Sequence, residues 1–100
     1  MGSLEQTDAE SAAVQKTPHR VSLESIKEKI SGVEYLHPNA LPTMTIAVVT
    51  MKNGYAIVGK SAPADPENFN PELGCKFAYE DAVRQIWPLE GYALRERLAD

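Results

Sequence analysis

The sequence predicts an α+β protein with a short N-terminal helix, a two-stranded antiparallel hairpin and a long C-terminal helix. Two short segments rich in β-branched residues, 44–51 and 55–61, flank an Asn-Gly pair, which is the strongest short hairpin signal. A capping signal opens the long helix at residue 71, and apolar residues then recur at steps of three and four. Segment 23–31 repeats this helical spacing on a smaller scale.

The length and net charge of the chain limit the number of domains and the kinds of partner it can have. One hundred residues are enough for one small domain, and the net charge of −4 argues against binding to duplex nucleic acid, which relies on a basic surface. Residues 1–20 are polar and without clear periodicity, so we expect a mostly flexible arm, with a transient helix near residues 9–14, followed by a single α+β domain at 21–100. No segment is apolar enough to span a bilayer, and no signal peptide is visible, so we expect no membrane partner and a location inside the cell.

The short helix has a start signal and a stop signal. Ser22 can cap it, Leu23, Ile26 and Ile30 share one face, and Gly32 is a natural end. The following stretch, 33–42, reads as irregular.

The hairpin predicts a partner subunit. A two-residue Asn-Gly turn would place Thr50 opposite Ile57 and Val49 opposite Val58. Both faces would then be apolar: one carries Ile46, Val48, Thr50, Tyr55 and Ile57, and the other carries Ala47, Val49, Met51 and Val58. The long helix can cover one face, but the short helix is too small to cover the other, so we expect a homo-oligomer that completes the sheet or the core.

The long helix begins at a clear signal, Asn70-Pro71-Glu72, in which Asn caps and Pro takes the first helical position. It is predicted to reach Trp87. At Pro88 either the helix kinks or a second helix begins.

The sequence contains few motifs that indicate catalysis or cofactor binding. It has no nucleophile elbow, phosphate-binding glycine loop or dinucleotide fingerprint. The single cysteine, Cys75, reads as a small core residue, and His19 and His37 have no second ligand at a metal-binding spacing. We therefore predict no metal, no cofactor and no enzymatic activity.

A binding site remains conceivable at the start of the long helix, where free N–H groups and the helix dipole favour an anion. The candidate ligand-binding residues are Asn68, Phe69, Lys76, Tyr79 and Arg84, which would meet across an oligomer interface. Each has a plainer interpretation as well: Phe69 as an anchor for its loop, and Lys76 and Arg84 as solvated helix charges.

Three strings give the chain a family resemblance: MKNGYAIVGKSA at 51–62, DPENFNPELG at 65–74 and IWPLEGYAL at 86–94. Over about residues 21–98 the chain resembles the gene-49/gene-66 family of small tailed-phage proteins. The resemblance implies a phage or prophage origin and a location in the host cytoplasm. The chain departs from the family pattern at Pro88, where Glu is common, and at Cys75 and Phe77, which lie in a stretch that is typically more basic.

The family in turn is similar to Thoeris anti-defence proteins, phage sponges that sequester cyclic nucleotide-like immune signals in interfacial pockets of an oligomer. This resemblance implies a non-catalytic binder of a small nucleotide ligand. Two alternatives stay open: a protein–protein interaction module that acts on a host factor, and a minor structural component of the virion.

Overall fold

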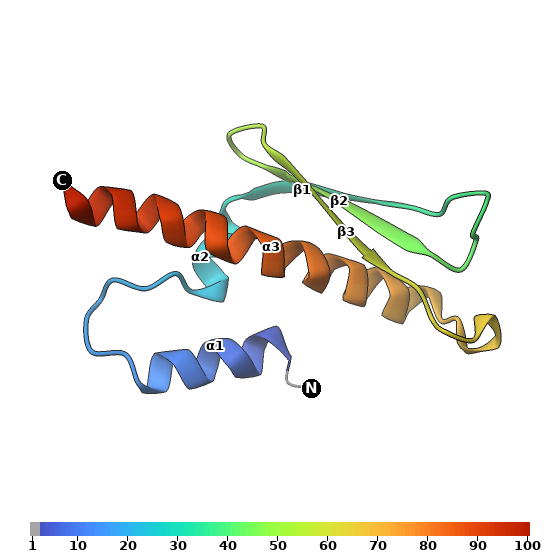
Figure 1. The fold of residues 1–100 in the computed structure, drawn as a ribbon, viewed down its shortest axis with the longest axis horizontal. Coiled ribbons are helices and arrows are strands. Elements are labelled where there is room, and N and C mark those ends of the chain that lie inside the picture. Colours follow the sequence, from blue (N-terminus) through green and yellow to red (C-terminus); the bar gives the residue numbers. More distant parts are fainter. Residues whose placement is uncertain (1–2) are drawn as a thin grey trace.

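The computed structural model describes residues 3–100 and confirms the α+β class (Figure 1). Its elements are α1 (Leu4–Ala13), α2 (Leu23–Glu28), β1 (Ile30–Leu36), β2 (Thr45–Met51), β3 (Ala56–Ser61), the short 3-10 helix η1 (Pro66–Asn68) and α3 (Pro71–Ala99). The strands form one antiparallel sheet in the order β1-β2-β3. In Figure 1 the sheet lies on one side of α3 and α1 lies on the other, so α3 is the central layer.

The long helix forms as the sequence predicts and then continues further. The Asn70 side chain accepts a hydrogen bond from the Leu73 N–H at 3.1 Å, which confirms the cap. α3 runs through Pro88 to Ala99 as one helix, so the alternative of a second helix is wrong. Pro88 and Arg84, the residue whose carbonyl loses its usual donor, are both exposed, and water can therefore replace the missing bond.

The sheet has a third strand that the sequence analysis did not expect. The Ser22 cap is confirmed, but α2 ends at Glu28, and segment 30–36 pairs with β2 instead of ending a helix and entering an irregular stretch. The register shifts between Ile30 and Gly32. This irregularity breaks the alternation of apolar and polar residues that would have revealed a strand.

The hairpin is confirmed, but its register differs by one residue from the prediction. The Met51 N–H donates to the Tyr55 carbonyl at 2.8 Å, so the loop has three residues, and Gly54 takes the positive φ of 91° that such a loop requires. Val49 therefore lies opposite Ile57, and Val48 lies opposite Val58. Because a slip of one residue exchanges the faces of a strand, Ile57 is buried and Val58 is exposed, the reverse of their predicted grouping.

β3 and α3 pack so closely that only glycine fits between them. A Cβ on Gly59 would lie 2.1 Å from the Ala78 carbonyl oxygen and 2.5 Å from the Ala82 nitrogen. Around this contact the buried face of the sheet meets the buried face of the helix. The fully buried core residues here are Ala47, Val49, Ala78, Ala82 and Val83.

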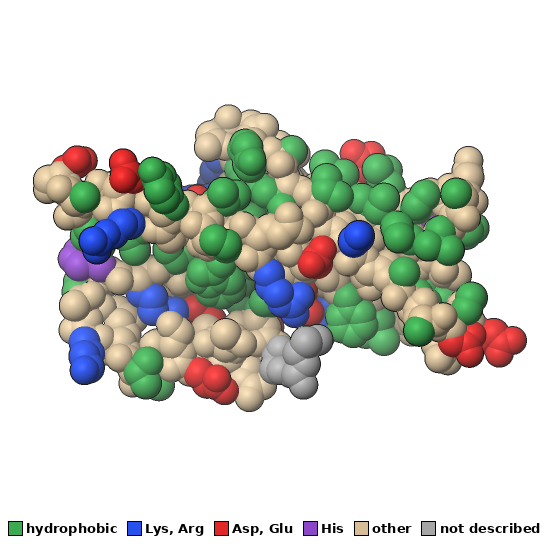
Figure 2. Space-filling view, viewed as in Figure 1, with side chains coloured by type: hydrophobic (Ala, Val, Ile, Leu, Met, Phe, Trp, Pro, Cys, Tyr) green, Lys and Arg blue, Asp and Glu red, His purple; other side chains and the backbone are tan. Residues whose placement is uncertain are grey.

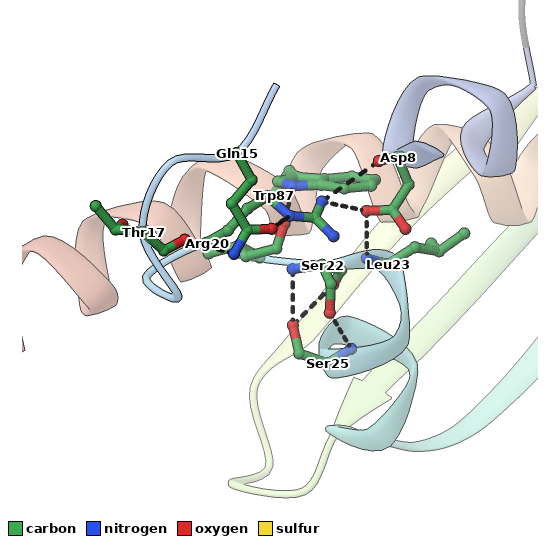
Figure 3. Close-up of polar contacts among 9 residues, drawn as sticks. Asp8, Gln15, Thr17, Arg20, Ser22, Leu23, Ser25 and Trp87 are labelled. Atoms are coloured by element: carbon green, nitrogen blue, oxygen red, sulfur yellow. Dashed lines mark hydrogen bonds and ion pairs between the residues drawn. The ribbon is translucent and has the colours of Figure 1, made fainter. Parts of the chain in front are cut away.

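The N-terminal segment contains a helix where the sequence suggested a flexible arm; its first two residues lie outside the described range. α1 buries only Leu4, so its sequence lacks the helical spacing of apolar residues by which a helix is usually predicted. Polar contacts hold it in place (Figure 3). The Asp8 carboxylate accepts from Arg20 Nη1 at 2.6 Å and from the Leu23 N–H at 3.1 Å, and the Trp87 indole donates to the Val21 carbonyl at 3.0 Å.

These contacts also affect the ionisation of Asp8. The hydrogen bond from Arg20 lowers the pKa of the Asp8 carboxyl below its ordinary value of 3.8, against the opposing effect of burial. A lowered folded-state pKa means that ionised Asp8 stabilises the fold fully above pH 3.8, and that this contribution disappears as the pH falls through the folded-state pKa.

We expect opposite effects from two glycine-to-alanine changes. Gly59→Ala should lower the free energy of unfolding by about 3 kcal/mol, since the methyl group would collide with helix backbone that cannot move aside. Gly91→Ala should raise it by roughly 1 kcal/mol, because nothing lies within 4 Å of the added Cβ and alanine favours a helix. Urea denaturation of both variants checks this, and equal effects would contradict the close packing at Gly59.

Asp8→Asn should lower the free energy of unfolding at pH 7 by about 1 kcal/mol, because the charged acceptor for Arg20 is lost. The gap between wild type and variant should close as the pH falls below 3.8, where wild-type Asp8 also loses its charge. Glu10→Gln, on the same helix and exposed, is the matched control and should show no gap at any pH. A gap that persists at low pH would show that the ion pair is not its cause.

Candidate functional site

A groove of about 590 Å³ lies between the hairpin loop and the C-terminal half of α3. We call it the hairpin groove. Its lining residues are Lys29, Met51, Lys52, Asn53, Tyr55, Ile57, Ile86, Leu89, Glu90 and Ala93. The β2–β3 hairpin and α3 therefore supply nearly all of the surface, and the end of α2 supplies one lysine.

The groove has an apolar floor and a polar rim. The floor consists of Met51, Ile57, Ile86, Leu89 and Ala93, and several of these side chains belong to the hydrophobic core. The rim consists of Lys29, Lys52, Asn53, Tyr55 and Glu90. Small-molecule sites commonly combine an apolar surface with a few fixed polar groups in this way.

Backbone hydrogen bonds fix the rim. The Lys52 N–H donates to the Lys29 carbonyl at 2.8 Å, which ties the hairpin loop to the end of α2 and brings both lysines to one end of the groove. The Asn53 Oδ1 accepts from the Tyr55 N–H at 3.0 Å. This local turn leaves the Asn53 amide NH₂ group as a donor, and it presents the Tyr55 ring, which is 59% exposed.

The charge of the rim is opposite to that of the whole chain. Two lysines and one glutamate give the groove a net charge of +1, against −4 for the chain. Lys29 forms an ion pair with Glu90. Within residues 3–100, Lys52 has no carboxylate partner, so its ammonium group is available to an anion.

The titratable side chains of the groove are two lysines, one tyrosine and one glutamate. The ten lining residues include no serine, cysteine or histidine, and their one carboxylate, Glu90, forms an ion pair with Lys29. Among residues 3–100 no cluster of histidine, cysteine or acidic side chains is placed to hold a metal ion.

In the same range no helix has the length and apolar composition needed to cross a lipid bilayer.

Two of the predicted site residues, Asn68 and Phe69, line a second, smaller hollow of about 180 Å³ at the start of α3. Phe69 also packs edge-on against His37, with ring centroids 6.2 Å apart, which fits the role of a loop anchor. Hydrophobic side chains gather at this end of the molecule (Figure 2). Leu73 and Phe77, which are both exposed, line the hollow. No lysine or arginine lines it, so it offers an anion only weak attraction.

The other three predicted residues lie elsewhere on α3. Lys76 and Arg84 are exposed and about 12 Å apart along the helix axis, given 1.5 Å per residue. Tyr79 is half-buried near Tyr35, and burial, followed by Tyr35, raises the pKa of its hydroxyl. None of the three lines either cavity, so a single chain does not bring the five predicted residues together. Their meeting across an oligomer interface stays a prediction.

The sequence analysis missed the hairpin groove, although it had singled out the strings that form it. Met51 to Ile57 belongs to the first string, and Ile86 to Ala93 belongs to the third. Two of the three strings on which the family resemblance rests therefore face each other across one cavity. The positions of Lys52 and Tyr55 beside the groove depend on the three-residue hairpin loop. The sequence predicted a two-residue turn, so the groove could not be foreseen.

Fold and groove together define a small α+β protein with a ligand-sized cavity beside its hairpin. The chain belongs to the phage protein (N4 Gp49/phage Sf6 gene 66) family, whose model matches residues 21–98. Neither the curated proteins nor the solved structures gave a match. The matched region begins directly after α1 and its connection, and it includes the whole hairpin groove.

Proposed function

We propose that this phage protein binds a nucleotide-derived anion, of the cyclic nucleotide type used as a host immune signal, and sequesters it without turning it over. The observation that carries the proposal is the hairpin groove, which has an exposed tyrosine above an apolar floor and a lysine without a carboxylate partner among residues 3–100. A phage protein of this kind would act in the host cytoplasm during infection.

The size of the groove supports this ligand class. Pockets for small molecules usually measure about 300–1,000 Å³, and the hairpin groove, at about 590 Å³, lies inside that range. The second hollow, at about 180 Å³, is too small for a nucleotide.

The rim supplies the contacts that a nucleotide needs. The Tyr55 ring can stack on a base, an interaction that tolerates any base because each has a π-face. The Lys52 ammonium can act as a point charge for a phosphate, and the Asn53 amide can donate to a base edge or a sugar hydroxyl. The apolar floor keeps water from one side of the bound molecule.

The first experiment is a thermal-shift screen against cyclic dinucleotides, cyclic trinucleotides and cyclic ADP-ribose isomers, run beside native mass spectrometry. A ligand at one hundred times its dissociation constant should stabilise the fold by about 2.7 kcal/mol. Mass spectrometry should recover the ligand intact after incubation. The absence of any shift would contradict the proposal and favour a module that acts on a host protein.

Variants then locate the site. Lys52→Ala and Tyr55→Ala should each weaken binding by about tenfold or more, because each removes a charge or a stacking contact worth at least 1.4 kcal/mol. Lys60→Ala is the matched control, since Lys60 is exposed on β3 outside the groove and should bind as the wild type does. A loss of binding in Arg84→Ala, with Lys52→Ala unaffected, would move the site to the α3 residues that the sequence predicted.

A further inference from the structure

The two edges of the sheet differ. Along β3, the Lys60 N–H donates to the Asp81 carboxylate at 2.9 Å, and the Gln85 side chain donates to the Val58 carbonyl at 2.8 Å. Side chains of α3 thus occupy two of the backbone groups through which another strand would pair. β1 is the other edge, and no element covers its outer side in the described chain.

Between its irregularity at Ile30 and Gly32 and its end at Leu36, β1 has few of the features by which edge strands usually avoid pairing. Between Ser31 and Leu36 there is no lysine and no proline, and Glu34 is the only charge. Its apolar side chains remain partly open to solvent: Val33 and Tyr35 are each 38% exposed, and Leu36 is 45% exposed. An exposed edge with a single charged residue is open to pairing with another strand.

The register identifies the free backbone groups of β1. The bond from the Met51 N–H to the Tyr55 carbonyl shows that alternate residues of β2, Val49 and Ala47 among them, point their N–H and C=O groups toward β3. The intervening residues of β2 therefore pair with Gly32, Glu34 and Leu36 of β1. The N–H and C=O groups of Val33 and Tyr35 then point outward.

From this geometry we infer that a second copy of the chain pairs antiparallel with β1, which gives a continuous six-stranded sheet with three strands from each copy. A strand edge is complementary to itself when a two-fold axis runs through it, so one chain supplies both partners. Pairing would use the outward groups of Val33 and Tyr35 and would bury part of their exposed side chains. Neither residue lines the hairpin groove, so pairing and ligand binding are separate properties.

Three registers are possible, and they differ in the β1 residue through which the two-fold axis passes: Val33, Glu34 or Tyr35. The charge of Glu34 and the irregularity of β1 exclude two of them. An axis through Glu34 would place the two Glu34 carboxylates directly opposite each other, which is destabilising. An axis through Val33 would carry the pairing into the irregularity between Ile30 and Gly32. An axis through Tyr35 avoids both, because Tyr35 faces its counterpart and Glu34 faces Leu36 of the second copy.

Disulfide trapping tests both the pairing and its register. The variants are made in a Cys75→Ser background, which removes the native thiol, and each carries a single cysteine in place of Val33, Glu34 or Tyr35. The control is Lys60→Cys on β3, the edge that α3 side chains contact. Opposed residues in a hydrogen-bonded pair have Cα atoms about 5.5 Å apart, which a disulfide can span. Tyr35→Cys should cross-link about tenfold or more faster than the control, since pairing holds the two thiols together.

Sedimentation at micromolar concentration provides the second readout. The wild type should sediment as a dimer or a larger assembly, and Val33→Pro should sediment as a monomer with unchanged helix content, because proline removes an outward N–H that the β1–β2 ladder does not use. Val33→Ala is the control and should stay associated. A wild-type monomer, or equal cross-linking in all four cysteine variants, would overturn the pairing. Faster cross-linking through Val33→Cys or Glu34→Cys would overturn the register.

Discussion

The contact between Gly59 of β3 and the α3 backbone at Ala78 and Ala82 is the constraint on which the rest of the structure depends. Close approach of strand and helix brings the buried face of β2 onto the small residues of α3 and lets Asp81 and Gln85 reach the β3 edge. It also fixes the distance between the hairpin loop and the second half of α3. The width of the hairpin groove follows from that distance, so a packing requirement in the core shapes a surface on which ligands can bind.

Much of the fold could be predicted from local signals. The caps at Ser22 and Asn70 and the existence of a hairpin at Asn53-Gly54 each depend on a few neighbouring residues, and the structure contains all three. The features that were missed depend on distant contacts. β1 is visible only through its pairing with β2 across a bulge, and α1 is held by Asp8 and Arg20 rather than by an apolar face.

The candidate site was harder to predict for a related reason. Sequence analysis pointed to the start of α3, because Asn70 and the helix dipole form a local signal there, and the structure gives that end only a small hollow without a cation. The hairpin groove arises from residues about 35 positions apart in the sequence, such as Tyr55 and Glu90, and no local rule joins them. Only the hairpin register and the unbroken course of α3 through Pro88 bring those two segments together.

The contacts of Asp81 and Gln85 with the β3 edge limit how many copies of the chain could join through their sheets. A sheet with two open edges can add copies at both sides without end and elongate into a fibril. Here Asp81 and Gln85 occupy two backbone groups of the β3 edge, so β1 is the more open edge, and the pairing of two copies through β1 covers it in a single step. Pairing through β1 alone would therefore end at two copies rather than extend into a fibril.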